Sequence, residues 1–339
     1  MDLNPLLTID NSLNDDTPLY RTVDFFSATS MITENTFMFT RSDQFSDPNE
    51  GIDRLLRQLE VATPGSGCGM GWSDNDSAKK SHQAVKRSHF ISCWSKNPES
   101  VAMWSLYSPD FCSVRLETTV GQLRQAVLEL LNRYSVMNVS ESDQGSCPIV
   151  SVSGLIAPVH YEDLEMIRSR VSRRFRAHQR ILKRYERKGI TKPTLNKVDK
   201  RYYEREEARE MASLRSTCRL KDTSFEHEKE VRVIVRLGET KLVDALLEDK
   251  ELANPSHKYH KQLFGKNLDL LEYISRNELP LREFVQTDSM IINSVAIDPR
   301  SPPHKDKFMR EWFQERSIPQ VKSKCFGYVT DNFTVFPDR

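Results

Sequence analysis

Several features that define common protein classes are missing from this chain of 339 residues. No stretch approaches the roughly 18 consecutive apolar residues that a membrane-spanning helix needs. The first residues are acidic and lack the basic start of a secretory signal, so we expect a cytoplasmic protein without membrane contact. The six cysteines include no CxxC pair. We therefore expect reduced cysteines, mostly in the core, and no metal site.

Two glycine-rich phosphate-binding patterns are also absent. None of the 12 glycines falls in the order GxxxxGK[ST], which argues against a Walker loop. A GxGxxG turn and a regular alternation of strands and helices are missing as well, so a Rossmann domain is a poor fit.

What the chain does contain favours an α+β protein with a folded core. It has 16 Phe, 10 Tyr and 4 Trp, and its net charge is only +1. Strands are predicted at 89–95 and 225–237, a short helix at 101–108 and an amphipathic helix at 119–137. In the strand at 225–237, valines alternate with charged residues, as in a strand with one buried face.

The near-zero net charge conceals a strongly basic segment. Residues 166–201 hold 14 basic and two acidic side chains, a local charge of +12. Apolar spacing predicts a helix over 166–189, and the pattern resumes as a second helix over 199–216. We therefore predict a basic helical hairpin inserted at 161–215 into one body, formed by residues 1–160 and 216–339.

The basic segment has three interpretations that the sequence leaves open. It is a solvated face that balances the acidic remainder of the chain, a surface for nucleic acid, or a surface for an acidic protein partner. The residues expected to contact a nucleic acid or partner are Arg173, Arg174, Arg176, Lys183 and Arg184.

Three further clusters are candidates for chemistry. Glu228, Glu230 and Arg232 share one face of the predicted strand, where they either hold the hydroxyls of a sugar or form ordinary surface salt bridges. Ser95 borders the end of an earlier strand. The aromatic residues of the following helix form either a stacking surface for a planar ring or part of the core. Arg21 stands beside an aromatic residue on the first predicted strand, and an arginine in such a position can bind a phosphate or a ribose.

Taken together, the order of these segments resembles an uncharacterised prokaryotic family, domain of unknown function 2971. That family shows an LY-basic start, an F-N-D-P-x-E loop, C-F-S followed by M-W-x-x-Y, and W-x-x-E-x-E-x-R. The matching residues are Tyr20, Arg21, Phe45, Asp47, Pro48, Glu50, Cys93, Ser95, Met103, Trp104, Tyr107, Glu228, Glu230 and Arg232. Ser46, Trp94 and Phe225 depart from the family pattern.

More distantly, the layout is similar to ADP-ribosyltransferases, including toxins that modify nucleic acids. The resemblance implies a split β-sheet core, NAD as the substrate that donates ADP-ribose, and a role as a toxin or antiviral defence effector. It makes Arg21 the orienting residue and Glu230 or Glu228 the catalytic carboxylate. Tyr20, Ser95 and Arg232 join the cofactor-binding set, with Tyr107 or Trp104 stacking on nicotinamide. We accordingly expect four of these residues to converge on one cleft: Arg21, Tyr107, Glu228 and Glu230.

Two other functions remain open from the sequence. One is a non-enzymatic module that binds nucleic acid or protein through the basic hairpin. The other is a metal-dependent nuclease, suggested by Asp47-Pro48 and the EHEKE run. The spacing of the nuclease pattern fails, because His227 stands two positions before Lys229, where an acid is required.

Overall fold

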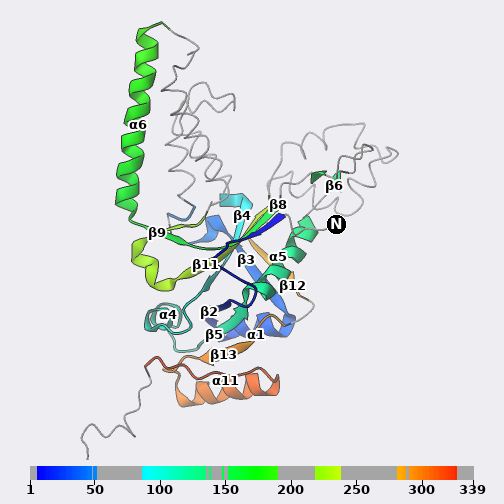
Figure 1. Ribbon diagram of the computed structural model, residues 1–339. Helices are drawn as coiled ribbons and strands as arrows, with labels where there is room; N and C mark the ends of the chain where they lie inside the picture. The colour runs from blue at the N-terminus through cyan, green and yellow to red at the C-terminus, as the bar shows by residue number, and fades with distance from the viewer. Residues whose placement is uncertain are drawn as a thin grey trace, which may run out of the picture.

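The computed structural model shows a mixed α+β protein built around one large sheet (Figure 1). It describes residues 6–47, 49–51, 86–134, 137–138, 147–148, 152–189, 218–237, 281–287 and 290–326. Among the helices in these ranges, none combines the length and apolar character that a membrane crossing requires.

The central sheet is nine-stranded and mixed, and it includes strands from both sides of the predicted insertion. Its main path runs β1-β8-β11-β4-β2-β5-β13, and β3 and β12 form a branch from β4. Only β1 and β8 pair in parallel within this sheet. The strands are β1 (Leu7–Ile9), β2 (Pro18–Asp24), β3 (Thr36–Arg41), β4 (His89–Ser95), β5 (Ser113–Thr119), β8 (Val152–Pro158), β11 (Glu230–Leu237), β12 (Arg282–Gln286) and β13 (Ser294–Ile297).

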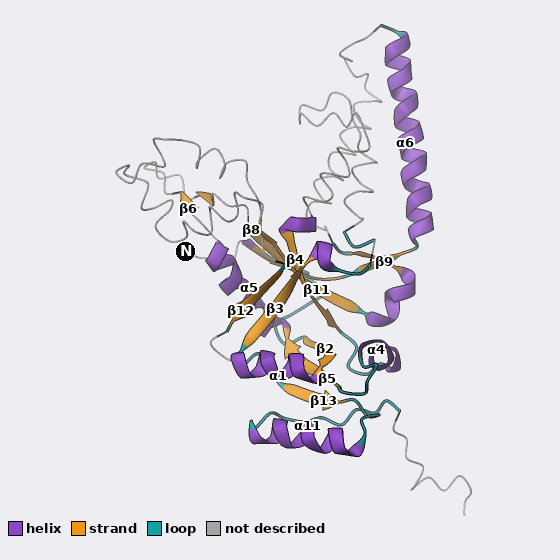
Figure 2. Ribbon diagram, turned by 180° about the vertical axis from the view of Figure 1, so that it is seen from behind, coloured by secondary structure: helices purple, strands orange, loops and turns teal. Residues whose placement is uncertain are grey.

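The remaining elements are helices and short strands around this sheet (Figure 2). The α-helices are α1 (Phe25–Glu34), α4 (Val101–Tyr107), α5 (Val120–Tyr134), α6 (Leu164–Arg187) and α11 (Pro303–Glu315). Two 3₁₀ turns, η2 (Ser42–Gln44) and η3 (Thr223–Glu228), border the site described below. Short strands pair outside the main sheet: β9 (His160–Glu162) with β10 (Leu220–Asp222), and β6 (Met137–Asn138) with β7 (Cys147–Pro148).

The main core fills one face of the sheet beneath α1, α5 and α11. Val231, Val233 and Val235 of β11 point into it, as the alternation in the sequence predicted. Phe37 of β3 stacks on Trp94 of β4 with their ring centroids 5.9 Å apart. The opposite face of β11 therefore carries its charged residues.

The sheet forks at β4, and this fork creates the space for a site. One edge of β4 pairs with β11 along its whole length. Its other edge pairs with β3 near its start, at Ile91, and with β2 near its end, at Ser95. Because β2 and β3 diverge between these points, the middle of β4 has no strand beside it on that edge in the described part of the chain.

Helix α6 contains the first part of the basic segment and extends away from the sheet (Figure 1). It begins close to the predicted position and ends two residues before Gly189. Of the contact residues expected on it, Arg173, Arg176, Lys183 and Arg184 are exposed. The side chain of Arg174 and the predicted second helix at 199–216 lie outside what the structure describes.

One predicted strand is wrong in its first boundary. The strand predicted from residue 225 begins only at Glu230, because η3 occupies the preceding residues. Asp222 caps η3 by accepting from the backbone N–H of Ser224, and Lys229 ends it in the left-handed conformation, with φ at 42°.

We predict that replacing Gly154 by alanine destabilises the fold by about 1 to 3 kcal/mol. Gly154 pairs with Leu7 beneath α5. An added Cβ would lie 2.7 Å from Val127 Cγ1 and 2.8 Å from Leu7 Cδ1. Urea unfolding of Gly154→Ala and of the control Ser153→Ala, whose side chain is exposed, measures the difference. Equal stabilities would contradict this close packing of α5, β8 and β1.

Candidate functional site

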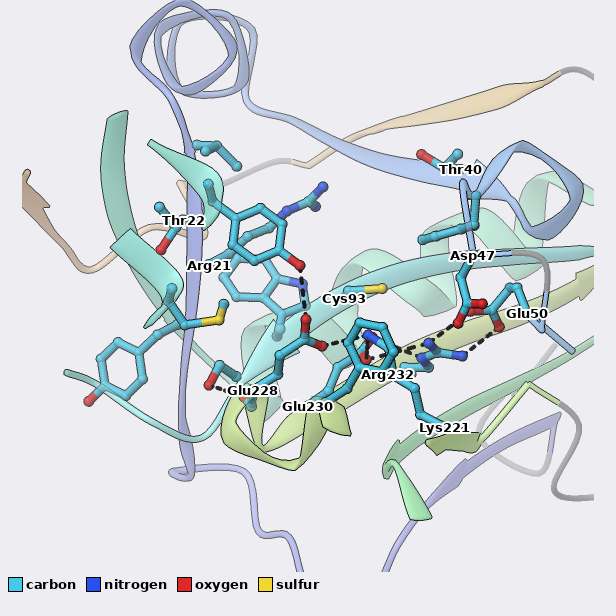
Figure 3. Close-up of a pocket in the computed structure, with 18 of the residues that line it drawn as sticks. Arg21, Thr22, Thr40, Asp47, Glu50, Cys93, Lys221, Glu228, Glu230 and Arg232 are labelled. Atoms are coloured by element: carbon cyan, nitrogen blue, oxygen red, sulfur yellow. Dashed lines mark hydrogen bonds and ion pairs between the residues drawn. The ribbon is translucent and has the colours of Figure 1, made fainter. Parts of the chain in front are cut away.

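A pocket of about 520 Å³ lies on the charged side of the fork (Figure 3). Residues of β2, β3, β4, α4, η3, β10 and β11 and of the loop at 45–50 line it. Its volume lies within the range of small-molecule sites. The pocket brings together residues from both halves of the chain that were expected to converge: Arg21, Tyr107, Glu228 and Glu230.

A buried ion-pair network forms the floor of the pocket. The side chain of Arg232 is only 1% exposed and lies between two carboxylates. Its Nη1 donates to Glu50 Oε1 at 2.6 Å, and its Nε donates to Glu230 Oε1 at 2.8 Å. Nη1 also donates to the backbone oxygen of Cys218 at 2.6 Å. These bonds satisfy the guanidinium, as a buried charge requires.

Lys221 extends the network towards the pocket. Its Nζ lies 2.5 Å from Glu228 Oε2 and 3.2 Å from Glu230 Oε2, and it sits over the ring of Phe225. The other Glu228 oxygen accepts from the hydroxyl of Tyr107 at 3.1 Å. The order of charges is therefore Glu50, Arg232, Glu230, Lys221 and Glu228, with signs that alternate.

The network shifts the pKa values of its members. Burial acts to raise the pKa of Glu230, but the charges of Arg232 and Lys221 outweigh it and lower that pKa to about 2. Burial lowers the pKa of Lys221, yet the carboxylates of Glu230 and Glu228 raise it above its ordinary value. Burial and the charge of Glu228 raise the pKa of Tyr107. Tyr107 is therefore a hydrogen-bond donor at neutral pH.

Arg21 is the exception to this pairing. It lines the same pocket, and its Nη1 donates to the hydroxyl of Ser92 at 2.9 Å. No carboxylate pairs with it in the described ranges, and burial lowers its pKa from the ordinary value. Because an arginine stays protonated even so, Arg21 presents a charge that an anionic ligand can neutralise.

Three of the expected site residues have roles other than those predicted. Trp104 does not line the pocket; it is the buried residue of α4, 2% exposed, so its predicted stacking role is wrong. The hydroxyl of Ser95 donates to the backbone oxygen of Glu228 at 2.6 Å and so holds η3 in place. Arg232 is committed to its carboxylates, which leaves it little capacity for a ligand. Tyr20 lines the pocket, with Arg115 over its ring.

The position of Glu228 also corrects the sequence interpretation. It was placed with Glu230 on one strand face, but it ends η3 and precedes the left-handed Lys229. Neither carboxylate lies on an exposed surface, since Glu228 and Glu230 are 4% and 5% exposed.

Sequence reasoning missed Lys221 as a member of the site. It lies on a three-residue strand, β10, where no periodic pattern or motif distinguishes it. Glu50 stands in the loop that matches the family pattern, so that motif was a signal for it. The thiol of Cys93 also lines the pocket, and burial and the charge of Glu230 raise its pKa well above the ordinary value.

The network has a consequence for metal binding. Within the described ranges, no group of three His, Cys, Asp or Glu side chains has a geometry that could hold a metal ion. The oxygens of Glu50 and Glu230 are instead occupied by Arg232 and Lys221. A divalent cation would have to displace these side chains.

Comparison with family models, with curated proteins and with solved structures found no match to this chain. The resemblance to the family and to ADP-ribosyltransferases stays a prediction.

We predict that Glu230 stabilises the fold in a pH-dependent way. The pKa of Glu230 is about 2 in the folded protein, against an ordinary value of 4.5 that we expect in the unfolded chain. Its contribution to the free energy of unfolding is therefore full above pH 4.5 and is lost as the pH falls towards 2. Glu230→Gln should therefore be less stable than the unsubstituted protein at neutral pH, by about 3 kcal/mol, and the difference should shrink on acidification.

Chemical unfolding across this pH range measures both proteins and the control Glu226→Gln, which changes an exposed carboxylate on the preceding turn η3. A difference for Glu230→Gln that stays constant from neutral pH to pH of about 3 would show that its carboxylate is not held ionised by Arg232 and Lys221.

Proposed function

We propose that the protein is an NAD-dependent ADP-ribosyltransferase that modifies a macromolecule. The observation that carries the proposal is the presence, in one pocket, of an oriented carboxylate, Glu228, and of a guanidinium, Arg21, that no carboxylate of the described residues pairs with. NAD contains a pyrophosphate and two ribose rings, so it offers the anion and the hydroxyls that these two groups bind.

The residues suit the bond that breaks in such a transfer. The bond between nicotinamide and the ribose C1′ breaks, nicotinamide leaves with the electron pair, and positive charge develops on the ribose. A carboxylate at the ribose hydroxyls stabilises this charge. The acceptor then forms a bond to C1′ and loses its proton. Tyr107 lines the pocket and is 44% exposed, which supports a role in stacking on the nicotinamide ring.

Between the two candidate carboxylates, the contacts favour Glu228. Both oxygens of Glu230 are bound by Arg232 and Lys221. Glu228 holds Lys221 with one oxygen only, and the other accepts from the Tyr107 hydroxyl. A ribose hydroxyl can replace the Tyr107 hydroxyl without breaking an ion pair. We therefore assign ribose binding to Glu228, and the positioning of Lys221 and Arg232 to Glu230.

The nuclease alternative is less well supported by these contacts. It requires carboxylates that are available to a divalent cation, whereas Arg232 and Lys221 already neutralise Glu50 and Glu230. A binding module without catalysis would need no unpaired guanidinium inside a pocket. The acceptor of the transfer, nucleic acid or acidic protein, stays a prediction here.

We predict that Glu228→Gln lowers the rate of ADP-ribose transfer by roughly 100-fold or more, because the amide cannot stabilise the positive charge on the ribose. The measurement is transfer of label from radiolabelled NAD to lysate components, together with release of nicotinamide. Glu226→Gln, exposed on the same turn η3, is the matched control and should keep full activity. Equal rates for Glu228→Gln and the unsubstituted protein would contradict the assignment.

We also predict that Arg21→Gln weakens NAD binding by about 10- to 100-fold, since a hydrogen bond to a charged group contributes roughly 1.5 to 3 kcal/mol. Isothermal titration with NAD gives the dissociation constants. Arg124→Gln, on α5 and paired with Asp15, removes the same charge outside the pocket and should change nothing. If Arg21→Gln binds NAD as tightly as the unsubstituted protein, the pyrophosphate does not lie at Arg21.

A further inference from the structure

Five exposed basic side chains lie along one face of α6. They follow one another at intervals of 3, 4, 3 and 4 residues, and this spacing keeps them on a single narrow face of a helix with 3.6 residues per turn. At 1.5 Å per residue they span about 21 Å. We call them the basic stripe: Arg173, Arg176, Arg180, Lys183 and Arg187.

Within the described residues, the basic stripe lacks the ion pairs that charged side chains of α11 form. On α11, Arg310 pairs with Asp306 and Lys307 with Glu311, each at a spacing of four residues. No carboxylate pairs with a side chain of the stripe in the described part of the chain. Each stripe residue instead has a like charge three or four positions away, which destabilises a helix by a few tenths of a kcal/mol per pair.

We propose that the basic stripe docks on the phosphate backbone of a nucleic acid. A polyanion relieves the repulsion between the five charges and releases its own counterions, which favours binding further. Four of the five residues are arginines, whose guanidinium groups match phosphate oxygens in pairs. The stripe also runs along a helix that extends away from the body, where an elongated ligand has access (Figure 1).

The regularity of the stripe favours a nucleic acid over an acidic protein. Its charges recur every 4.5 to 6 Å, by the rise of about 1.5 Å per residue, along a straight line. A nucleic acid offers a comparable regular row of phosphates, whereas an acidic protein surface seldom does. Contacts of this kind position a protein without reading bases, so the binding is independent of sequence.

This docking surface goes beyond the proposed function, because it requires no chemistry in the pocket. The inference that the docked nucleic acid is also the acceptor of ADP-ribose rests on the proposed function. The two claims fail separately, since binding is measured without NAD and NAD cleavage is measured without nucleic acid.

The test compares two variants of the full chain. The stripe variant carries Arg173→Gln, Arg176→Gln, Arg180→Gln and Lys183→Gln. The control variant removes four exposed charges elsewhere, with Lys307→Gln, Arg316→Gln, Lys322→Gln and Lys324→Gln. Glutamine is a good helix former, so circular dichroism should show that α6 persists.

Fluorescence anisotropy with labelled DNA duplexes of unrelated sequence, titrated across salt concentrations, measures binding. We expect the unsubstituted protein and the control to bind all sequences alike. The stripe variant should bind at least about tenfold more weakly, and its log–log salt slope should be shallower by about 3 to 4, at about 0.9 per lost phosphate contact.

Three outcomes would overturn the proposal. The first is no binding of nucleic acid by the unsubstituted protein, and the second is equal weakening in both variants. The third is equally tight binding of polyglutamate, which would indicate an acidic protein partner instead. Folding of the stripe variant is monitored by its unfolding transition, and single substitutions of Arg176 and Arg180 replace it if that transition is lost.

Discussion

Arg232 is almost completely buried, and taking its guanidinium out of water would cost several kcal/mol if Glu50 and Glu230 did not face it. This requirement joins three parts of the chain, because Glu50 comes from the loop after η2, Glu230 begins β11, and Cys218 precedes β10. Lys221 extends the pairing to Glu228. The orientation of Glu228 in the pocket therefore depends on Arg232, although the two side chains form no direct bond.

Arg232 and Arg21 differ in the partners of their guanidinium groups. Both guanidinium groups lie at the pocket, but Arg232 is matched by two carboxylates and Arg21 by one hydroxyl. Neutralising the first charge makes its burial possible, whereas we propose that the second binds an anionic ligand. The basic stripe on α6 is similar, because within the described ranges no carboxylate pairs with its side chains.

The sequence was informative where local periodicity or motif order carries the structure. The alternating valines of β11 were assigned to the core correctly. The order of the motifs predicted that Arg21 and Glu228 share one cleft, and both line the same pocket. The sequence could not place Glu228 on η3, because the cap at Asp222 and the left-handed Lys229 override the strand pattern. Lys221 was missed because its role arises from partners on other elements, which no local pattern encodes.

We propose that Arg21 and Glu228 bind two adjacent groups of one nucleotide substrate, the pyrophosphate and the nicotinamide ribose, in a pocket whose base is formed by Arg232. A crystal structure with a non-hydrolysable NAD analogue tests this proposal. We expect the pyrophosphate at Arg21, a ribose hydroxyl on the Glu228 oxygen that Tyr107 now occupies, and an unchanged bond between Arg232 and Glu230. An analogue bound outside this pocket, or one bound with Glu228 turned away from the ribose, would contradict it.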